Sequence, residues 1–135
     1  MRKSINSLDQ LSKFSLDVLN KLSLGDVCLL YGGMGMGKTT FVSLLMEHLN
    51  FFEVSSPTYS IVQEYNSKPP VFHIDLYRVE SNSEIELLDL DYYLNQDDHF
   101  VFIEWAERLN KIEDSYLKLN FLKEENGDRI VEFNV

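Results

Sequence analysis

The strongest constraint on the fold is residues 32–39, whose sequence Gly-Gly-Met-Gly-Met-Gly-Lys-Thr matches the pattern G-x-x-x-x-G-K-[ST]. An apolar run at residues 27–31 precedes this segment and predicts a buried strand. Residues 39–49 follow it with apolar side chains at helical spacing, which predicts a helix. A strand, a glycine-rich loop and a helix in this order predict an α/β fold in which the loop binds phosphate.

Each position of the loop has a chemical reason. Glycines let successive backbone amides approach phosphate oxygens without an intervening Cβ, and the helix N-terminus adds free amides and partial positive charge. Lys38 brings a charge to the β- and γ-phosphates, and the hydroxyl of Thr39 is a magnesium ligand. The predicted nucleotide-binding residues of the loop are therefore Gly33, Met34, Gly35, Met36, Gly37, Lys38, Thr39 and Thr40.

A loop of this kind also needs a carboxylate near the metal ion and a group that positions the attacking oxygen. Glu104 follows the apolar run 99–103, at the kind of strand end where ligands gather in a doubly wound sheet, and it is predicted to be a metal ligand beside Thr39. Asp75 lies on the polar face of segment 71–77, which alternates with an apolar face. A solvated strand end for Glu104, and a salt bridge to Arg78 for Asp75, remain open alternatives.

Two further residues are candidates for the site. Thr58, in Ser56-Pro57-Thr58, lies downstream of the predicted helix, where such proteins place a hydroxyl that senses the γ-phosphate. Trp105 is the only tryptophan, and a core ring and a nucleotide contact are both open for it. The predicted catalytic set is Lys38, Thr58, Asp75 and Glu104.

The remaining pattern predicts one domain over residues 1–135. Capping boxes at Ser7–Gln10 and Ser83–Glu86 predict a first helix and an acidic helix that runs to about Leu94. Segments 59–65 and 71–77 flank a Pro-Pro loop, and segments 116–122 and 129–135 flank Asn126-Gly127, so each pair predicts a hairpin. The fold class predicted is α/β with three layers: a mixed, mainly parallel sheet flanked by helices, with antiparallel strands and hairpins.

Composition narrows the function. The net charge of −10 argues against nonspecific binding to duplex DNA or to an anionic membrane, because both need a positive field. Cys28 is the only cysteine, which excludes a disulfide framework and a zinc site built from cysteines. No secretory signal and no membrane-length apolar run is visible, so we expect a cytoplasmic protein.

Three classes of phosphate-loop protein compete. A GTPase needs D-x-x-G, which occurs nowhere in the chain. A small-molecule kinase usually has a lid and several arginines, whereas this chain has four arginines and no evident lid insertion. The third class is a small ATPase that acts as a switch inside a complex.

Four motifs resemble the bacterial TsaE (YjeE) family in order and spacing. They are Gly32 to Thr40, Ser56-Pro57-Thr58-Tyr59, His73-Ile74-Asp75-Leu76-Tyr77-Arg78 and Glu104-Trp105-Ala106-Glu107-Arg108. The resemblance spans nearly the whole chain. It implies a Mg²⁺-dependent ATPase required for the threonylcarbamoyl modification of adenosine beside the anticodon in tRNA. It also implies a TsaB–TsaD heterodimer as partner, with tRNA reached only indirectly through that complex.

The resemblance also assigns residues. It implies that Lys38 and the loop amides hold phosphates, that Thr39 and Glu104 bind Mg²⁺, that Asp75 lies near the metal or attacking water, and that Thr58 is a switch residue. It places Trp105 beside the metal site, and Asp9 (or Gln10) and Arg129 on the adenosine side. Asp89 stands where the family often has glycine, one of several departures that include Gly33, Met36 and Ala106.

Hydrolysis is expected to be slow in isolation. No arginine finger is evident beside the loop, and a finger supplied by a partner is worth roughly 10³–10⁵ in rate. Arg78 and Arg108 are possible internal substitutes. A metabolite kinase and a non-hydrolysing, ATP-dependent adaptor remain the alternative functions.

Overall fold

The structure is a computed structural model that describes residues 1–54 and 61–134. Its described strands form one seven-stranded sheet with the order β1-β7-β6-β2-β5-β4-β3. The strands are β1 (Arg2–Ile5), β2 (Val27–Tyr31), β3 (Val62–Tyr65), β4 (Val71–Asp75), β5 (Phe100–Glu104), β6 (Leu117–Lys123) and β7 (Arg129–Asn134).

The middle of the sheet is parallel and its two sides are antiparallel. β2 pairs in parallel with β5 and β6, and β4 pairs in parallel with β5. On one side of the sheet β3 pairs antiparallel with β4. On the other side β7 pairs antiparallel with both β6 and β1. Because parallel strands end at the same edge, β2, β4 and β5 bring Tyr31, Asp75 and Glu104 to one edge of the sheet.

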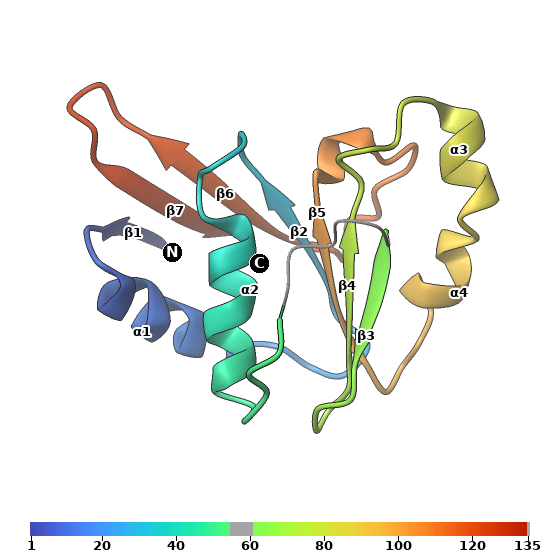
Figure 1. Cartoon of the computed structure of the whole chain (residues 1–135), viewed down its shortest axis with the longest axis horizontal. Helices are drawn as coiled ribbons and strands as arrows, with labels where there is room; N and C mark the ends of the chain where they lie inside the picture. Colours follow the sequence, from blue (N-terminus) through green and yellow to red (C-terminus); the bar gives the residue numbers. More distant parts are fainter. Residues whose placement is uncertain (55–60, 135) are drawn as a thin grey trace.

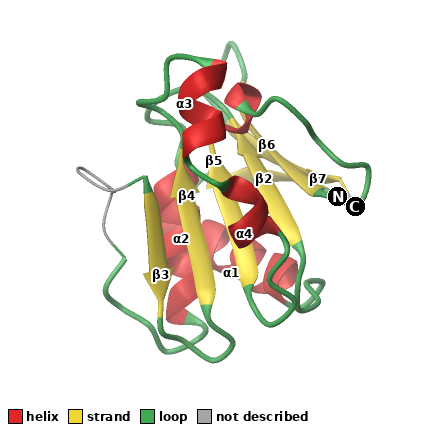
Figure 2. Cartoon of the chain, turned by 90° about the vertical axis from the view of Figure 1, so that its right-hand side faces the viewer, coloured by secondary structure: helices red, strands yellow, loops and turns green. Residues whose placement is uncertain are grey.

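Helices cover both faces of the sheet, so the predicted three-layer α/β fold class is confirmed (Figures 1 and 2). α1 (Leu8–Leu19) and α2 (Lys38–Glu47) pack on one face, where Phe14 and Phe41 join a core with Cys28 and Phe102. α3 (Asn82–Leu87) and α4 (Leu90–Leu94) pack on the other face, over a second core of aliphatic and aromatic side chains. A short 3₁₀ helix, η1 (Ala106–Arg108), follows β5.

The first predicted capping box is confirmed. Ser7 is the N-cap of α1, and its side chain accepts a hydrogen bond from the backbone N–H of Gln10 at 3.1 Å. The Gln10 side chain reaches back one residue further than expected and accepts from the N–H of Asn6 at 2.6 Å. Both bonds satisfy amides that the helix start leaves free.

The second predicted capping box is wrong by two residues. Ser81, not Ser83, is the N-cap of α3: its hydroxyl accepts from the N–H of Glu84 at 3.3 Å, and Glu84 accepts from the N–H of Glu80 at 2.7 Å. Ser81-Asn82-Ser83-Glu84 also fits the S-x-x-E pattern, so the sequence allowed both frames. The frame that forms places Ile85 in the core.

The acidic helix is also not continuous. Asp89 adopts a left-handed conformation with φ 52° and separates α3 from α4. That region of φ favours glycine, the residue that the family resemblance leads us to expect at this position. Asp is among the residues that tolerate it, because its short polar side chain bonds locally.

The remaining corrections concern α2, which spans Lys38–Glu47 rather than residues 39–49, and the strands. β1 was not predicted. It forms because Arg2–Ile5 pairs with β7, which lies at the other end of the sequence. β4 ends at Asp75 rather than residue 77, and β5 begins at Phe100 rather than residue 99 and ends at Glu104, the predicted strand end. No helix in the described part of the chain is long and apolar enough to cross a membrane.

Candidate functional site

The glycine-rich loop joins the end of β2 to the start of α2. Gly37 is the N-cap of α2 with φ 102°, and no side chain caps that end of the helix. The first-turn backbone N–H groups are therefore free to donate to a ligand in front of the helix. Gly32 has φ 144°, and a Cβ there would lie 2.9 Å from the carbonyl oxygen of Phe121. The loop therefore offers open amides at a helix N-terminus, which is an anion site.

The side chains of Thr39 and Glu104 meet at the edge of the sheet. The Thr39 hydroxyl lies 2.9 Å from each carboxylate oxygen of Glu104 and donates to that group. Thr39 comes from the first turn of α2 and Glu104 from the last position of β5. Glu104 is only 3% exposed, so the solvated strand end that the sequence left open does not form.

Lys38 is turned into the loop. Its ammonium group donates to the carbonyl oxygen of Gly32 at 2.6 Å and lies 4.0 Å from the centroid of the Trp105 ring. Burial lowers the pKa of Lys38, and the nearby carboxylates of Glu104, Glu107 and Asp75 oppose that shift. In this arrangement the lysine is held by a carbonyl of its own loop and by the aromatic face of Trp105, which follows β5.

Trp105 lies beside the lysine rather than in the middle of the core. It has φ 58°, a left-handed conformation that is strained for a bulky side chain, and it begins the turn of η1. Its ring packs against Tyr77 at 5.1 Å between centroids and against the guanidinium of Arg108 at 5.5 Å. Strained backbone conformations are common at functional sites. Here the left-handed conformation of Trp105 accompanies the packing of its ring face against Lys38.

Asp75 stands opposite Glu104 in the β4–β5 register. One of its carboxylate oxygens accepts from the N–H of Tyr77 at 2.9 Å, and no bond to Arg78 accompanies it among the described contacts. Burial raises the pKa of Asp75, the Tyr77 hydrogen bond opposes this, and the charge of Glu104 adds to the rise. Two carboxylates therefore lie on one edge in different environments.

One cavity of about 460 Å³ collects most of the predicted residues. It extends from the loop across the edge of the sheet to the start of β7, and Arg78 also lines it. The predicted residues that line it are Met34, Gly35, Met36, Gly37, Lys38, Thr39, Thr40, Asp75, Glu104, Trp105 and Arg129.

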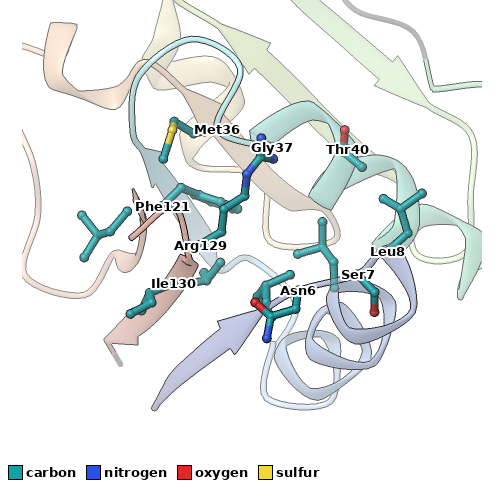
Figure 3. Close-up of a pocket in the computed structure, with 14 residues that line it drawn as sticks. Asn6, Ser7, Leu8, Met36, Gly37, Thr40, Phe121, Arg129 and Ile130 are labelled. Carbon is teal, nitrogen blue, oxygen red and sulfur yellow. The ribbon is translucent and has the colours of Figure 1, made fainter. Parts of the chain in front are cut away.

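A second cavity of about 360 Å³ adjoins the first. Figure 3 shows Arg129 extending from the start of β7 towards Gly37 at the N-terminal end of α2. Met36, Gly37, Thr40 and Arg129 line both cavities, so the loop, the start of α2 and this arginine connect them. Ser7 and Leu8, at the start of α1, close the far side.

Four candidate residues that the structure describes line neither cavity: Asp9, Gln10, Gly33 and Arg108. Asp9 pairs with Lys13 at 3.3 Å on the exposed side of α1, and Gln10 caps its own helix. Thr58 lies outside the described residues. Arg108 is half-buried and donates to the carbonyl oxygen of Val79 at 2.5 Å, away from the loop.

The structure adds two residues that the sequence did not assign to the site. Nε2 of His73 lies 2.5 Å from Glu104, and Nδ1 lies 2.8 Å from the hydroxyl of Tyr65. The signal was present, because His73 is on the same polar strand face as Asp75. The sequence did not place it in the site, since nothing local linked it to Glu104, a residue thirty-one positions away.

The donor set at the edge fits Mg²⁺ better than a metal held by protein alone. The described residues hold no group of three or more His, Cys, Asp or Glu side chains that would cage an ion. A hydroxyl and a carboxylate next to a phosphate-binding loop are instead what Mg²⁺ uses, since it takes one or two protein oxygens together with phosphate oxygens.

Comparisons with known proteins show which family the chain belongs to. A family model described as "Threonylcarbamoyl adenosine biosynthesis protein TsaE" matches residues 5–131. A curated "tRNA threonylcarbamoyladenosine biosynthesis protein TsaE" of Borreliella burgdorferi is 38% identical over 126 residues, which cover 90% of each chain. The protein of the same name from Nostoc sp. is 34% identical over 131 residues, covering 92% of this chain and 80% of the relative.

The fold has a solved counterpart. The crystal structure of Bacillus subtilis YdiB superposes with a TM-score of 0.77 at 23% identity, covering 98% of this chain and 83% of that one. This likeness supports the fold, while the sequence matches cover the loop, the Asp75 strand and the Glu104 strand together. The chain belongs to the TsaE family.

Proposed function

We propose that this protein binds ATP with Mg²⁺ and hydrolyses it to ADP and phosphate, in the biosynthesis of threonylcarbamoyladenosine in tRNA. The observation that carries the chemical part is the contact between the Thr39 hydroxyl and both carboxylate oxygens of Glu104 at the mouth of the loop. The part of the proposal that concerns the pathway is supported by membership of the family. The curated relatives bear the name of that biosynthesis.

The roles of the residues follow from their positions. The first-turn amides of α2 and Lys38 bind the phosphates, and the lysine exchanges the Gly32 carbonyl for phosphate oxygens when it does so. Thr39 and Glu104 hold Mg²⁺, which when bound neutralises charge on the β- and γ-phosphates. Trp105 covers Lys38 and keeps water from that side.

Asp75 is the residue proposed to orient the attacking water. It lines the same cavity as Lys38 and Thr39, and it lies across the β4–β5 pair from Glu104 without contacting Thr39 in the described structure. A carboxylate in this place accepts a hydrogen bond from water and aligns it with the phosphate. The metal-side acid and the water-side acid are thereby assigned to different strands.

The adjoining cavity of about 360 Å³ is proposed as the nucleoside side. It opens at Gly37 and Thr40, where the chain of phosphates would leave the loop, and Arg129 lies between the two cavities. Its lining mixes apolar side chains, such as Leu8 and Met36, with polar groups such as Asn6. Such a lining suits a base and ribose.

A TsaB–TsaD heterodimer is the proposed partner, with ATP hydrolysis as the switch that resets it. Arg78 is the one predicted internal finger that lines the cavity, and it comes from the loop after β4 rather than from the phosphate-binding loop itself. Slow hydrolysis alone, and stimulation by the partner, follow from that placement. The net charge of −10 favours contact with tRNA through the complex rather than directly.

Glu104→Ala tests the assignment of the metal side. Hydrolysis with Mg²⁺ is expected to fall by a factor of roughly 10²–10³, the usual cost of losing a charge-stabilising group. ADP affinity without Mg²⁺ is expected to stay within about twofold. Phosphate release and calorimetric titration measure the two quantities, and Glu86→Ala on the exposed side of α3 is the matched control. If hydrolysis survives in Glu104→Ala, Asp75 becomes the metal-side acid.

A further inference from the structure

Three neighbouring strands place one polar side chain each along a diagonal of the sheet face that α2 covers. In the β3–β4 register Gln63 stands opposite His73, so Tyr65 is the diagonal neighbour of His73. In the β4–β5 register Phe102 stands opposite His73, so Glu104 is its diagonal neighbour on the other side. Tyr65, His73 and Glu104 therefore form a row that ends at Thr39.

The row is connected by short contacts. Nε2 of His73 lies 2.5 Å from a carboxylate oxygen of Glu104. Nδ1 lies 2.8 Å from the hydroxyl of Tyr65, which itself lies 2.8 Å from the side-chain oxygen of Gln63. Because an ionised carboxylate only accepts, the hydrogen of the first contact lies on Nε2 and is donated to Glu104.

All three members are buried. His73 is 0% exposed, Glu104 3% and Tyr65 4%. The Tyr65 ring is fixed by Phe51, with 4.9 Å between ring centroids. A buried polar group left without a partner is costly, so the imidazole and the carboxylate are held in one orientation.

We infer that His73, fixed by Tyr65, is a positioning residue that holds the Glu104 carboxylate in the orientation that meets Thr39. The Thr39 hydroxyl contacts both carboxylate oxygens of Glu104. His73 contacts only one of them, Oε2, and makes no contact with Oε1 among the described contacts. His73 thereby restrains rotation of the carboxylate and leaves its second oxygen to the metal side. Neither Tyr65 nor His73 lines the nucleotide cavity, so both act through Glu104.

This inference rests on the proposed function, and its test measures how much Mg²⁺ tightens ADP binding. The quantity is the ratio of the ADP dissociation constants without and with Mg²⁺, from calorimetric titration of the full chain. We call the tightening of ADP binding by Mg²⁺ the gain. Glu104→Ala is expected to abolish it. Tyr65→Phe, which removes one hydroxyl and keeps the ring, is expected to reduce it several-fold. His73→Leu is expected to reduce it about 10-fold or more, the usual cost of losing the outer partner of a metal ligand.

Two further variants separate positioning from mere packing. His73→Gln keeps an N–H donor near the place of Nε2 and is expected to recover part of the gain that His73→Leu loses. Tyr65→Phe added to Glu104→Ala is expected to change nothing further, because its effect passes through the carboxylate. Tyr93→Phe, on the opposite face of the sheet, is the matched loss of a hydroxyl and is expected to leave the gain unchanged.

The outcomes are distinguishable. If Mg²⁺ does not tighten ADP binding in the native protein, the proposed metal site is wrong and the inference falls with it. If Glu104→Ala abolishes the gain while Tyr65→Phe and His73→Leu keep it, the site stands and only the positioning role is overturned. ADP affinity without Mg²⁺, and the melting temperature, show in every variant that the loop and the fold remain intact.

Discussion

Lys38 is the residue whose contacts are expected to change when the loop binds a nucleotide. Its ammonium group is held by the Gly32 carbonyl at 2.6 Å and by the Trp105 ring, and under the proposed function the carbonyl contact is exchanged for phosphate oxygens. The exchange is favourable because burial has already stripped water from the lysine, and phosphate oxygens are stronger partners than a carbonyl. Trp105 is also the only tryptophan, so its fluorescence reports this exchange directly.

Lys38→Ala should weaken ATP binding by roughly 10- to 100-fold. A hydrogen bond between charged groups contributes about 1.5–3 kcal/mol, which corresponds to that range. Titration of Trp105 fluorescence or heat with ATP measures it. Lys111→Ala removes an exposed lysine and serves as the charge-matched control. Equal ATP affinity in Lys38→Ala and the native chain would refute the assignment of the loop.

At this scale the sequence predicted residues whose role is written in a linear motif. Lys38 and Thr39 lie inside the loop, and Glu104 follows an apolar run, so their positions could be inferred without coordinates. The role of Tyr65 could not, because it depends on the registers of β3, β4 and β5 together. A shift of one residue in either register would turn the row to the other face.

Among the elements, α3 offers the clearest test of local sequence chemistry. Ser81 caps its first turn through the N–H of Glu84, whereas Ser83 lies within the helix with an exposed side chain. Two overlapping S-x-x-E patterns therefore compete, and packing of Ile85 in the core selects one of them.

Ser81→Ala should lower the free energy of unfolding by about 1 kcal/mol, the usual cost of losing a serine N-cap. Ser83→Ala should change it by less than about 0.5 kcal/mol, as for an exposed position. Urea denaturation followed by circular dichroism compares the two. Equal losses of stability, or a larger loss for Ser83→Ala, would contradict the assignment of Ser81 as the N-cap of α3.

The missed strand has a different cause. β1 has four residues, three of them exposed, so it carries none of the alternation that marks a strand in sequence. It forms because β7 offers an unpaired edge, to which the backbone of Arg2–Ile5 bonds. By contrast, the hairpin between β6 and β7 was visible, since Asn126-Gly127 is a strong turn signal, and Gly127 has φ 91°.

For the whole molecule, His99 couples stability to pH at the edge far from the loop. Its ring stacks on Phe72 with 4.1 Å between centroids, and its nitrogens contact Glu64 at 2.8 Å and Asp98 at 2.7 Å. Burial by itself lowers the pKa of His99, but the hydrogen bonds to Glu64 and Asp98 raise it and prevail. The folded state thus favours the imidazolium form.

Since the folded pKa of His99 lies above its unfolded value of 6.5, the stabilisation is complete below that pH and is lost as pH rises through the folded pKa. The free energy of unfolding should therefore fall as pH increases from about 6.5. Glu64→Gln should flatten this fall, and Glu86→Gln should not. Urea denaturation across that pH range measures it, and identical profiles for Glu64→Gln and the native chain would contradict the coupling.

The account as a whole is tested most directly by phosphate release from Mg-ATP, with the protein alone and with a TsaB–TsaD pair. Slow release alone, abolished by chelating Mg²⁺ and increased at least 10-fold by the pair, is the predicted result. An unchanged rate, with ATP binding and complex formation both verified, would contradict the switch and favour an adaptor that binds ATP without hydrolysing it. Transfer of the labelled phosphate to a metabolite instead of water would make the protein a kinase.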